Sequence, residues 1–340
     1  MLLSYLRNFK TQAWPPRPTF TEADVPAGSQ ACRVFIVTGG NAGIGFELCK
    51  ILFAAGATIY MASRSEDKAE AAIKEITEGV PQNGSGRGQI KYLHLDLRDL
   101  HSVKAAAHSF AQQEPKLDVL WNNAGTGANG IKFGERTAQD LEPMMGMHCV
   151  ATLLFTELLV PQLKAAAAVS ASGKTRVVWL ASGLVDEAAP ENGVDFAILD
   201  KGLKNRAKNY GASKAGTWIL GREFARRYGK DGILSVILNP GNLKSGSFAG
   251  TPPLVMLFMN AVMLYKPVFG AYTELFAGLS PEVTMEQNGI YIIPWGRLRP
   301  DHTILRKDIV KAMKPEEEGG LGYGGRFWDW CEAQWKPFVA

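Results

Sequence analysis

Short apolar runs with many β-branched residues recur along the chain, separated by longer segments of helical pattern. Such runs have the length and composition of buried parallel strands. Those identified are Val34–Val37, Thr58–Ala62, Tyr92–Leu95, Val119–Trp121, Val177–Ala181, Ile233–Leu238 and Ile290–Ile293. Strand and helix in alternation predict right-handed crossovers, and therefore a doubly wound, Rossmann-type α/β fold. We expect a parallel sheet of about seven strands with helices on both faces.

The segments around these strands suggest the domain organisation. Residues 1–30 are rich in proline and polar residues and show no hydrophobic period, so we predict an N-terminal arm lying on the domain that follows. Residues 31–340 are then one dinucleotide-binding catalytic domain. Thr137, with Asp140 three residues later, resembles a capping box, which predicts a helix that begins there and continues through Leu159.

Composition restricts the class of partner. The 340 residues are 46% hydrophobic and carry a net charge of +4 from dispersed Lys and Arg, which does not favour nucleic acid. The four cysteines have no C-x-x-C pairing, so we expect no metal site, no disulfide framework and a cytoplasmic location. Charges interrupt the apolar stretch Leu254–Leu279, which favours a buried helix or a pocket wall over membrane association.

A glycine-rich turn follows the first predicted strand, from Thr38 to Gly45, and a helical pattern begins directly after it. Such a turn lets the backbone approach a pyrophosphate and offers free N–H groups at the helix N-terminus. The spacing is G-x-x-x-G-x-G instead of the G-x-G-x-x-G fingerprint, so a turn without a ligand stays an alternative. The residues assigned to the cofactor here are Gly39, Asn41, Gly43, Ile44 and Gly45.

The end of the second predicted strand indicates which dinucleotide binds. An NAD enzyme would place Asp or Glu there, whereas this chain has Ser63 followed by Arg64. A guanidinium suits the 2′-phosphate of NADP(H), so we predict NADP(H) over NAD(H). The alternative is that Arg64 is a solvated loop residue beside Glu66 and Asp67.

Tyr210 and Lys214 are four residues apart, which places them on one helix face. A neighbouring cation favours the phenolate, so the tyrosine pKa, ordinarily about 10, is expected to fall toward working pH. Ser182 follows a predicted strand, at the edge of the sheet where ligands bind, and could hold a substrate carbonyl. The alternative is a serine that only begins a loop.

In this order the motifs resemble the short-chain dehydrogenase/reductase family over roughly residues 33–250. Details are most similar to retinol-dehydrogenase-like members of fungal type. The matching positions are Thr38–Gly45, Asp96, Asn122–Gly125, Ser182, Tyr210–Lys214 and Pro240–Ser245.

The resemblance implies a role for each position. Tyr210 would donate a proton to the carbonyl oxygen, Ser182 would orient that oxygen, and Lys214 would bind the ribose and modify Tyr210. The other implied cofactor contacts are Asp96, Leu97, Asn123, Ala124, Gly125, Pro240, Gly241, Leu243 and Ser245. The asparagines of the Asn122–Gly125 motif could instead only satisfy backbone groups.

His148 departs from the family pattern, because many members carry an asparagine there that anchors a proton-relay water. The imidazole could hold that water, shuttle protons itself near neutral pH, or be structural. The resemblance also implies a substrate lid at roughly 246–280 and leaves 298–340 as a C-terminal extension. The Met and aromatic residues of the lid fit a bulky apolar substrate, and ordinary core packing is the alternative.

The implied function is an NADP(H)-dependent oxidoreductase that interconverts a carbonyl and an alcohol on an apolar small molecule. A ketone or aldehyde reductase, acting on natural products among others, is the form we expect. The alternatives are a non-catalytic NADP-binding sensor or scaffold, and an NADP-dependent epimerase or dehydratase of the same fold. The expected partner is a hydrophobic carbonyl or alcohol substrate, and a homo-oligomer stays open.

Overall fold

The computed structural model describes residues 2–80, 88–244, 256–257, 260 and 263–339. One sheet has the strand order β3-β2-β1-β4-β5-β6-β7-β8, which confirms the doubly wound prediction. Pairing is parallel from β3 to β7, and only β8 runs antiparallel to β7. The strands are β1 Val34–Thr38, β2 Thr58–Ser63, β3 Gln89–His94, β4 Val119–Asn122, β5 Thr175–Leu180, β6 Ile233–Leu238, β7 Tyr291–Ile293 and β8 Arg297–Arg299.

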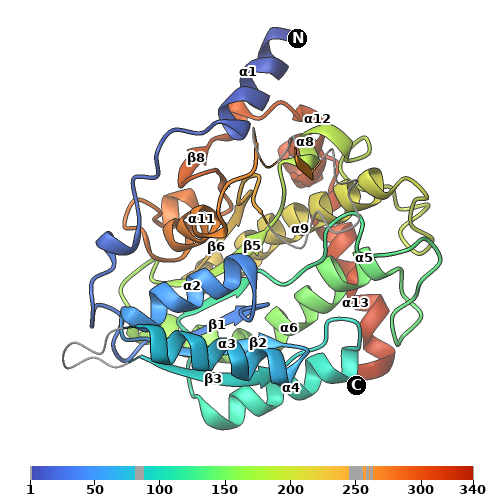
Figure 1. Cartoon of the computed structure of the whole chain (residues 1–340). Helices are drawn as coiled ribbons and strands as arrows, with labels where there is room; N and C mark the ends of the chain where they lie inside the picture. Colours follow the sequence, from blue (N-terminus) through green and yellow to red (C-terminus); the bar gives the residue numbers. More distant parts are fainter. Residues whose placement is uncertain (1, 81–87, 245–255, 258–259, 261–262, 340) are drawn as a thin grey trace.

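Helices cover both faces of the sheet (Figure 1), and each face has its own apolar cluster. The first layer comprises α2 Gly43–Ala54, α3 Glu66–Gly79 and α11 Pro267–Leu279. The second comprises α4 Leu100–Gln113, α6 Thr152–Leu158, α7 Val160–Val169, α9 Arg206–Tyr228 and α13 Tyr323–Val339. Shorter helices are α5 Pro143–Met145, α8 Leu184–Ala188 and α12 Lys307–Met313. The loops that follow the parallel strands therefore converge at one edge of the sheet, where ligands bind in this fold.

Two differences from the sequence-based prediction concern regular structure. The sheet has an eighth strand, β8, whose three residues are too few and too charged to show a strand pattern. The N-terminal arm begins with a helix, α1 Leu2–Ala13. An isolated helix of that length is marginal in water, so its stability must come from tertiary contacts.

The predicted start of the helix after β4 is also corrected. Asp140 has a positive φ of 58°, which a residue within a helix cannot adopt. The helix begins instead at Pro143, where the Glu142 carboxylate accepts a hydrogen bond from the Met145 N–H at 2.7 Å. Gly146–Ala151 continue it as a π-helix.

A buried arginine joins the start of β5 to the end of α11. Arg176 is 1% exposed and donates to the carbonyl oxygens of Gly173, Ala277, Ser280 and Val283 at 2.7–2.9 Å. Its guanidinium therefore caps the carbonyl end of α11 from within the protein. The α11 segment of the expected lid is in fact a core helix, while most of 246–266 lies outside the described residues.

Within the described ranges, no single helix is both long and apolar enough to cross a membrane. One bent helix pair, Pro143–Leu158 with Val160–Val169, meets the length and composition criteria only when its two parts are taken together.

Candidate active site

The glycine-rich turn has the geometry of an anion cradle. Helix α2 begins at Gly43, and its N-cap residue, Ala42, provides no side-chain hydrogen bond within the described structure. Gly43 has φ 58°, and a Cβ built there would meet no described heavy atom within 4 Å. A Cβ on Gly45 would lie 2.6 Å from the Gly39 carbonyl oxygen. The uncapped helix start and the open face at Gly43 fit a dinucleotide pyrophosphate, while Gly45 is required by close packing.

The segment after β4, which contains Asn123 and Ala124, is hydrogen-bonded to the glycine-rich turn. The Asn123 side chain donates to the Thr38 carbonyl oxygen at 2.7 Å, and the Ala124 N–H donates to Thr38 Oγ1 at 2.8 Å. A Cβ on Gly125 would lie 2.9 Å from His148 Nε2 and 3.5 Å from Lys214 Nζ. Asn123 thus satisfies backbone groups, and small residues here keep the turn and the catalytic helices close together.

The other predicted cofactor residues lie around the same edge of the sheet. Arg64 is exposed directly after β2, and its guanidinium has no hydrogen-bond partner among the described residues, whereas Ser63 is buried. Asp96 follows β3 and accepts the Arg98 N–H at 2.9 Å, and Leu97 beside it is buried. Ser245 lies outside the described residues.

A cavity of about 340 Å³ opens at the carboxyl ends of the strands. Ile44 of the glycine-rich turn and the Pro240–Leu243 segment after β6 line one part of it. Ser182 and Tyr210 also line it, so both predicted hydroxyls face the same space as the cofactor turn. The cavity therefore brings Ser182 and Tyr210 together with some of the predicted cofactor residues, whereas Lys214 and His148 are not among its lining residues.

Tyr210 lies near the start of α9. Burial is the main influence on its hydroxyl and raises its pKa to about 12, against a smaller lowering by the hydrogen bond with Ser182. The expectation that Lys214 brings the tyrosine pKa toward neutrality is therefore wrong for the protein alone. Desolvation disfavours the phenolate more than the hydrogen bond with Ser182 favours it.

Lys214 is buried one helical turn further on. Its ammonium donates to the Leu180 carbonyl oxygen at 2.8 Å and lies 5.8 Å from the centre of the Tyr210 ring. Burial lowers its pKa, and burial raises the pKa of Glu274 in α11, whose charge acts on Lys214. No sequence pattern selects Glu274, because its place under the sheet depends on how α11 packs.

His148 is in the π-helical turn, where it joins two segments of the site. Its Nε2 accepts the Thr126 N–H at 3.2 Å, and its Nδ1 lies 2.9 Å from Ser213 Oγ. Ser213 in turn donates to the Tyr210 carbonyl oxygen at 2.9 Å. These partners select the neutral imidazole with its hydrogen on Nδ1.

Burial, with the Lys214 charge as a second cause, holds the pKa of His148 well below its ordinary value. Of the open alternatives for His148, the two hydrogen bonds of the ring and its lowered pKa favour a structural role over proton shuttling near neutral pH. A fixed, neutral ring remains, which supports Tyr210 edge-on at 5.8 Å between ring centres.

The cavity also has lining residues that sequence reasoning missed. They come from α1, from the segment after Ser182 and from the end of β6: Asn8, Phe9, Gln12, Asp186 and Asn239. No motif marks them, since none has a chemical partner near it in the sequence. The interpretation of residues 1–30 as having no period overlooks a weak signal: Leu6, Phe9 and Ala13 have helical spacing.

A family model, curated relatives and solved structures were compared with this chain, and they agree with one another. Residues 33–194 match the family model described as short chain dehydrogenase. The short-chain dehydrogenase/reductase iacJ of Pestalotiopsis fici is 47% identical over 337 residues, which cover 99% of this chain and 100% of the relative. A short-chain dehydrogenase/reductase of Phomopsis amygdali is 41% identical and covers 98% of each chain. The NADPH-bound carbonyl reductase from chicken fatty liver shares the fold, with a TM-score of 0.59 and 20% identity over 79% of this chain and 94% of that one.

Proposed function

The chain belongs to the short-chain dehydrogenase/reductase family of nicotinamide-dependent oxidoreductases, and on this basis we propose that it is an NADP(H)-dependent reductase of apolar ketones or aldehydes. The observation that carries the proposal is the shared cavity of Ser182, Tyr210 and the residues after β6, beside a glycine-rich turn that fits a dinucleotide. The cofactor supplies the hydride, or accepts it in the reverse direction.

The residues of the chain supply orientation and the proton. Ser182 Oγ accepts the Leu184 N–H at 3.2 Å, and its hydrogen bond with Tyr210 places both hydroxyls where they can donate to one substrate carbonyl oxygen. The Tyr210 hydroxyl, held protonated by its raised pKa, donates the proton to that oxygen. Lys214 is fixed by Leu180 at the base of the site, where its ammonium favours negative charge developing on the tyrosine.

The intact arrangement favours an enzyme over a sensor or scaffold. A chain that only binds the cofactor has no need for a serine and a tyrosine hydroxyl in one cavity with a buried lysine behind them. The direct test is consumption of NADPH by the purified protein with a panel of ketones and aldehydes. Consumption in proportion to alcohol formed supports net reduction, whereas product without consumption supports an epimerase or dehydratase.

Cofactor preference provides the next prediction. Replacing Arg64 by alanine is expected to weaken NADPH binding on the order of tenfold, because an exposed charge-assisted contact with the 2′-phosphate is lost. NADH binding should hardly change, since NADH lacks the 2′-phosphate. Titration of both cofactors by fluorescence measures the two affinities.

The matched control is Lys74→Ala, which removes one exposed positive charge from α3 away from the strand end. It should leave both affinities unchanged. Equal binding of NADPH and NADH by the wild type, or equal losses in the two variants, would contradict a role for Arg64.

His148 yields a prediction on pH dependence. His148→Asn should preserve the shape of the turnover profile through the neutral range, because the neutral ring of the wild type has no proton to lose there. His148→Leu leaves the Thr126 N–H without its partner and should destabilise the fold by about 1–3 kcal/mol. The measurements are pH–rate profiles and urea unfolding. A step near pH 6.5 that disappears in His148→Asn would restore the proton-shuttle hypothesis.

A further inference from the structure

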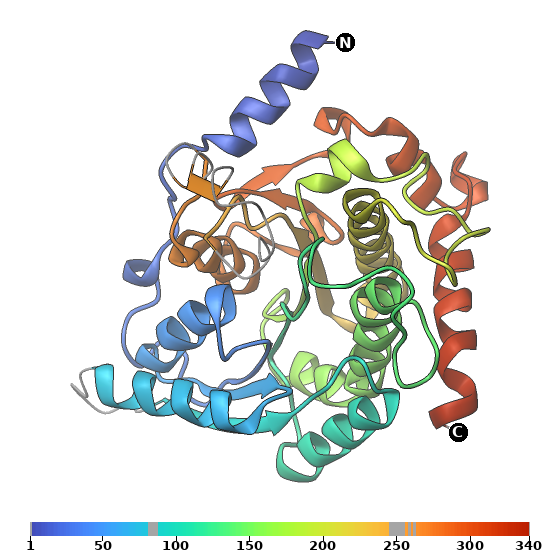
Figure 2. The ribbon, with the colours of Figure 1, turned by 45° about the vertical axis from the view of Figure 1, so that its right-hand side comes forward.

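Helix α1 lies at the cavity although it is far from the catalytic residues in sequence. Asn8, Phe9, Gln12 and Ala13 line the same space as Ser182 and Tyr210. The start of the helix stands out from the molecule (Figure 2), and its last turns contact the domain. One wall of the cavity therefore comes from a segment outside the nucleotide-binding fold.

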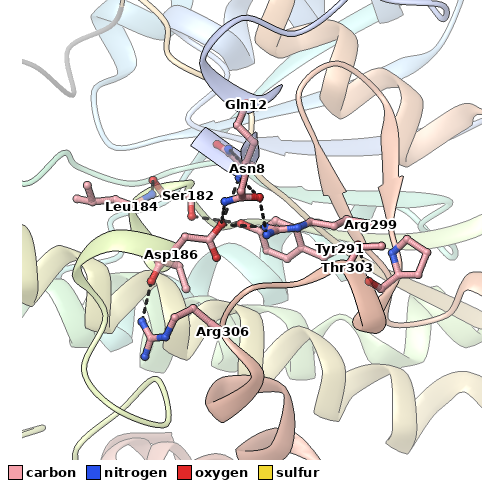
Figure 3. Close-up of polar contacts among 12 residues, drawn as sticks. Asn8, Gln12, Ser182, Leu184, Asp186, Tyr291, Arg299, Thr303 and Arg306 are labelled. Carbon is pink, nitrogen blue, oxygen red and sulfur yellow. Dashed lines mark hydrogen bonds and ion pairs between the residues drawn. The ribbon is translucent and has the colours of Figure 1, made fainter. Parts of the chain in front are cut away.

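A buried ion pair holds this helix in place (Figure 3). The Asp186 and Arg299 side chains are 7% and 5% exposed and lie 2.9 Å apart. Asp186 Oδ2 also accepts from Asn8 Nδ2 at 2.9 Å and from Gln12 Nε2 at 3.2 Å, and Arg299 donates to Asn8 Oδ1 at 2.7 Å. A buried ion pair is tolerated when further hydrogen bonds satisfy both partners, and here α1 supplies them.

Gln12 extends this network to the cofactor side of the cavity. Its side-chain oxygen accepts from Asn239 Nδ2 at 2.9 Å, and Asn239 Oδ1 accepts the Gly241 N–H at 3.0 Å. Asn239 is 5% exposed and directly precedes the Pro240–Leu243 segment. One side chain of α1 thus connects helix α8 with the loop after β6.

The position of α1 next to the catalytic hydroxyls gives it a role in substrate choice. We propose that α1 is a specificity-determining wall, in which Phe9 contacts the apolar part of the substrate distant from the carbonyl and Gln12 is a positioning residue. The ring of Phe9 is half-buried at the cavity, so an extended apolar ligand would cover it further. This inference rests on the proposed carbonyl reduction.

The role of Phe9 is tested with two ketones of different length, 2-decanone and 2-butanone. Phe9→Ala is expected to lower kcat/KM for 2-decanone about tenfold, since an apolar contact is lost. The value for 2-butanone should change less than about twofold, because the short chain does not reach α1. Leu6→Ala is the control, since Leu6 lies on the same helix, is 51% exposed and does not line the cavity. Equal effects on both ketones, or none, would overturn the assignment.

Calorimetric binding of 2-decanone to the same variants gives a second readout that needs no turnover. A protein that reduces neither these two ketones nor any other member of the ketone and aldehyde panel would refute the proposed function. A tenfold weaker affinity for 2-decanone that occurs only in Phe9→Ala would still support α1 as a wall of the substrate site. An unchanged affinity would reject this role of α1.

The role of Gln12 is tested by amide hydrogen exchange across residues 6–14. Gln12→Ala removes the side chain that joins Asn8, Asp186 and Asn239, so exchange in α1 should accelerate at least about tenfold. KM for 2-decanone should rise with little change in kcat. The control Lys10→Ala alters an exposed residue of the same helix and should leave exchange unchanged. Exchange in Gln12→Ala equal to that of the wild type would reject docking through this residue.

Discussion

Tyr210→Phe is expected to lower turnover by about 10²–10⁴-fold, the range typical of losing a general acid, while the fold and cofactor affinity stay close to those of the wild type. The substitution deletes one oxygen. The ring keeps its edge-on contact with His148 at 5.8 Å, and the helix keeps the Ser213 hydrogen bond to the Tyr210 carbonyl. Steady-state rates with a reducible ketone and NADPH titration measure the two effects separately.

The raised pKa of Tyr210 also predicts how the rates of reduction and oxidation depend on pH. A phenol whose pKa is raised to about 12 by burial stays protonated through the neutral range, so reduction should not decline there for lack of a proton. Oxidation of the alcohol needs the deprotonated form and should become faster as the pH increases. A Phe variant that turns over at close to the wild-type rate would show that another group donates the proton.

Arg176→Met is expected to destabilise the protein by about 3–5 kcal/mol, the largest stability effect we anticipate. The guanidinium is 1% exposed and satisfies four carbonyl oxygens that have no access to water. Methionine fills part of the volume but donates no hydrogen bond, and each unsatisfied buried carbonyl costs about 1–3 kcal/mol. Urea unfolding at neutral pH measures the difference.

Arg17→Met is the appropriate comparison, because Arg17 is exposed and should tolerate the change within about 0.5 kcal/mol. Both variants should keep their turnover per folded molecule, since neither arginine lines the cavity. A loss below about 1 kcal/mol in Arg176→Met would mean that water or a shift of α11 satisfies the carbonyls.

Most of the parallel strands were predictable because a continuous apolar run identifies them, whereas the mixed sequence of β3 shifted its predicted start from Gln89 to Tyr92. Val34–Thr38 and Ile233–Leu238 are buried throughout, as the apolar pattern requires. Strand β8 escaped prediction because Arg297 and Arg299 make it look like a loop, and the partners of these side chains include distant residues such as Thr11 and Asp186. The helix α1 escaped for a related reason, since its stability comes from those same distant partners.

The sequence was also sufficient to predict that Ser182, Tyr210 and the glycine-rich turn lie near one another. Spacing places Tyr210 and Lys214 on one helix face, and strand ends bring Ser182 and the glycine-rich turn to one edge of the sheet. Only the tertiary structure decided their protonation, because burial raises the pKa of Tyr210 and lowers that of His148. The tertiary structure also decided that α1 lines the cavity. Gln12 of this helix contacts Asp186 and Asn239, which are 174 and 227 positions away in the sequence. Local patterns report what a segment can form, whereas desolvation and long-range hydrogen bonds depend on which segments pack together.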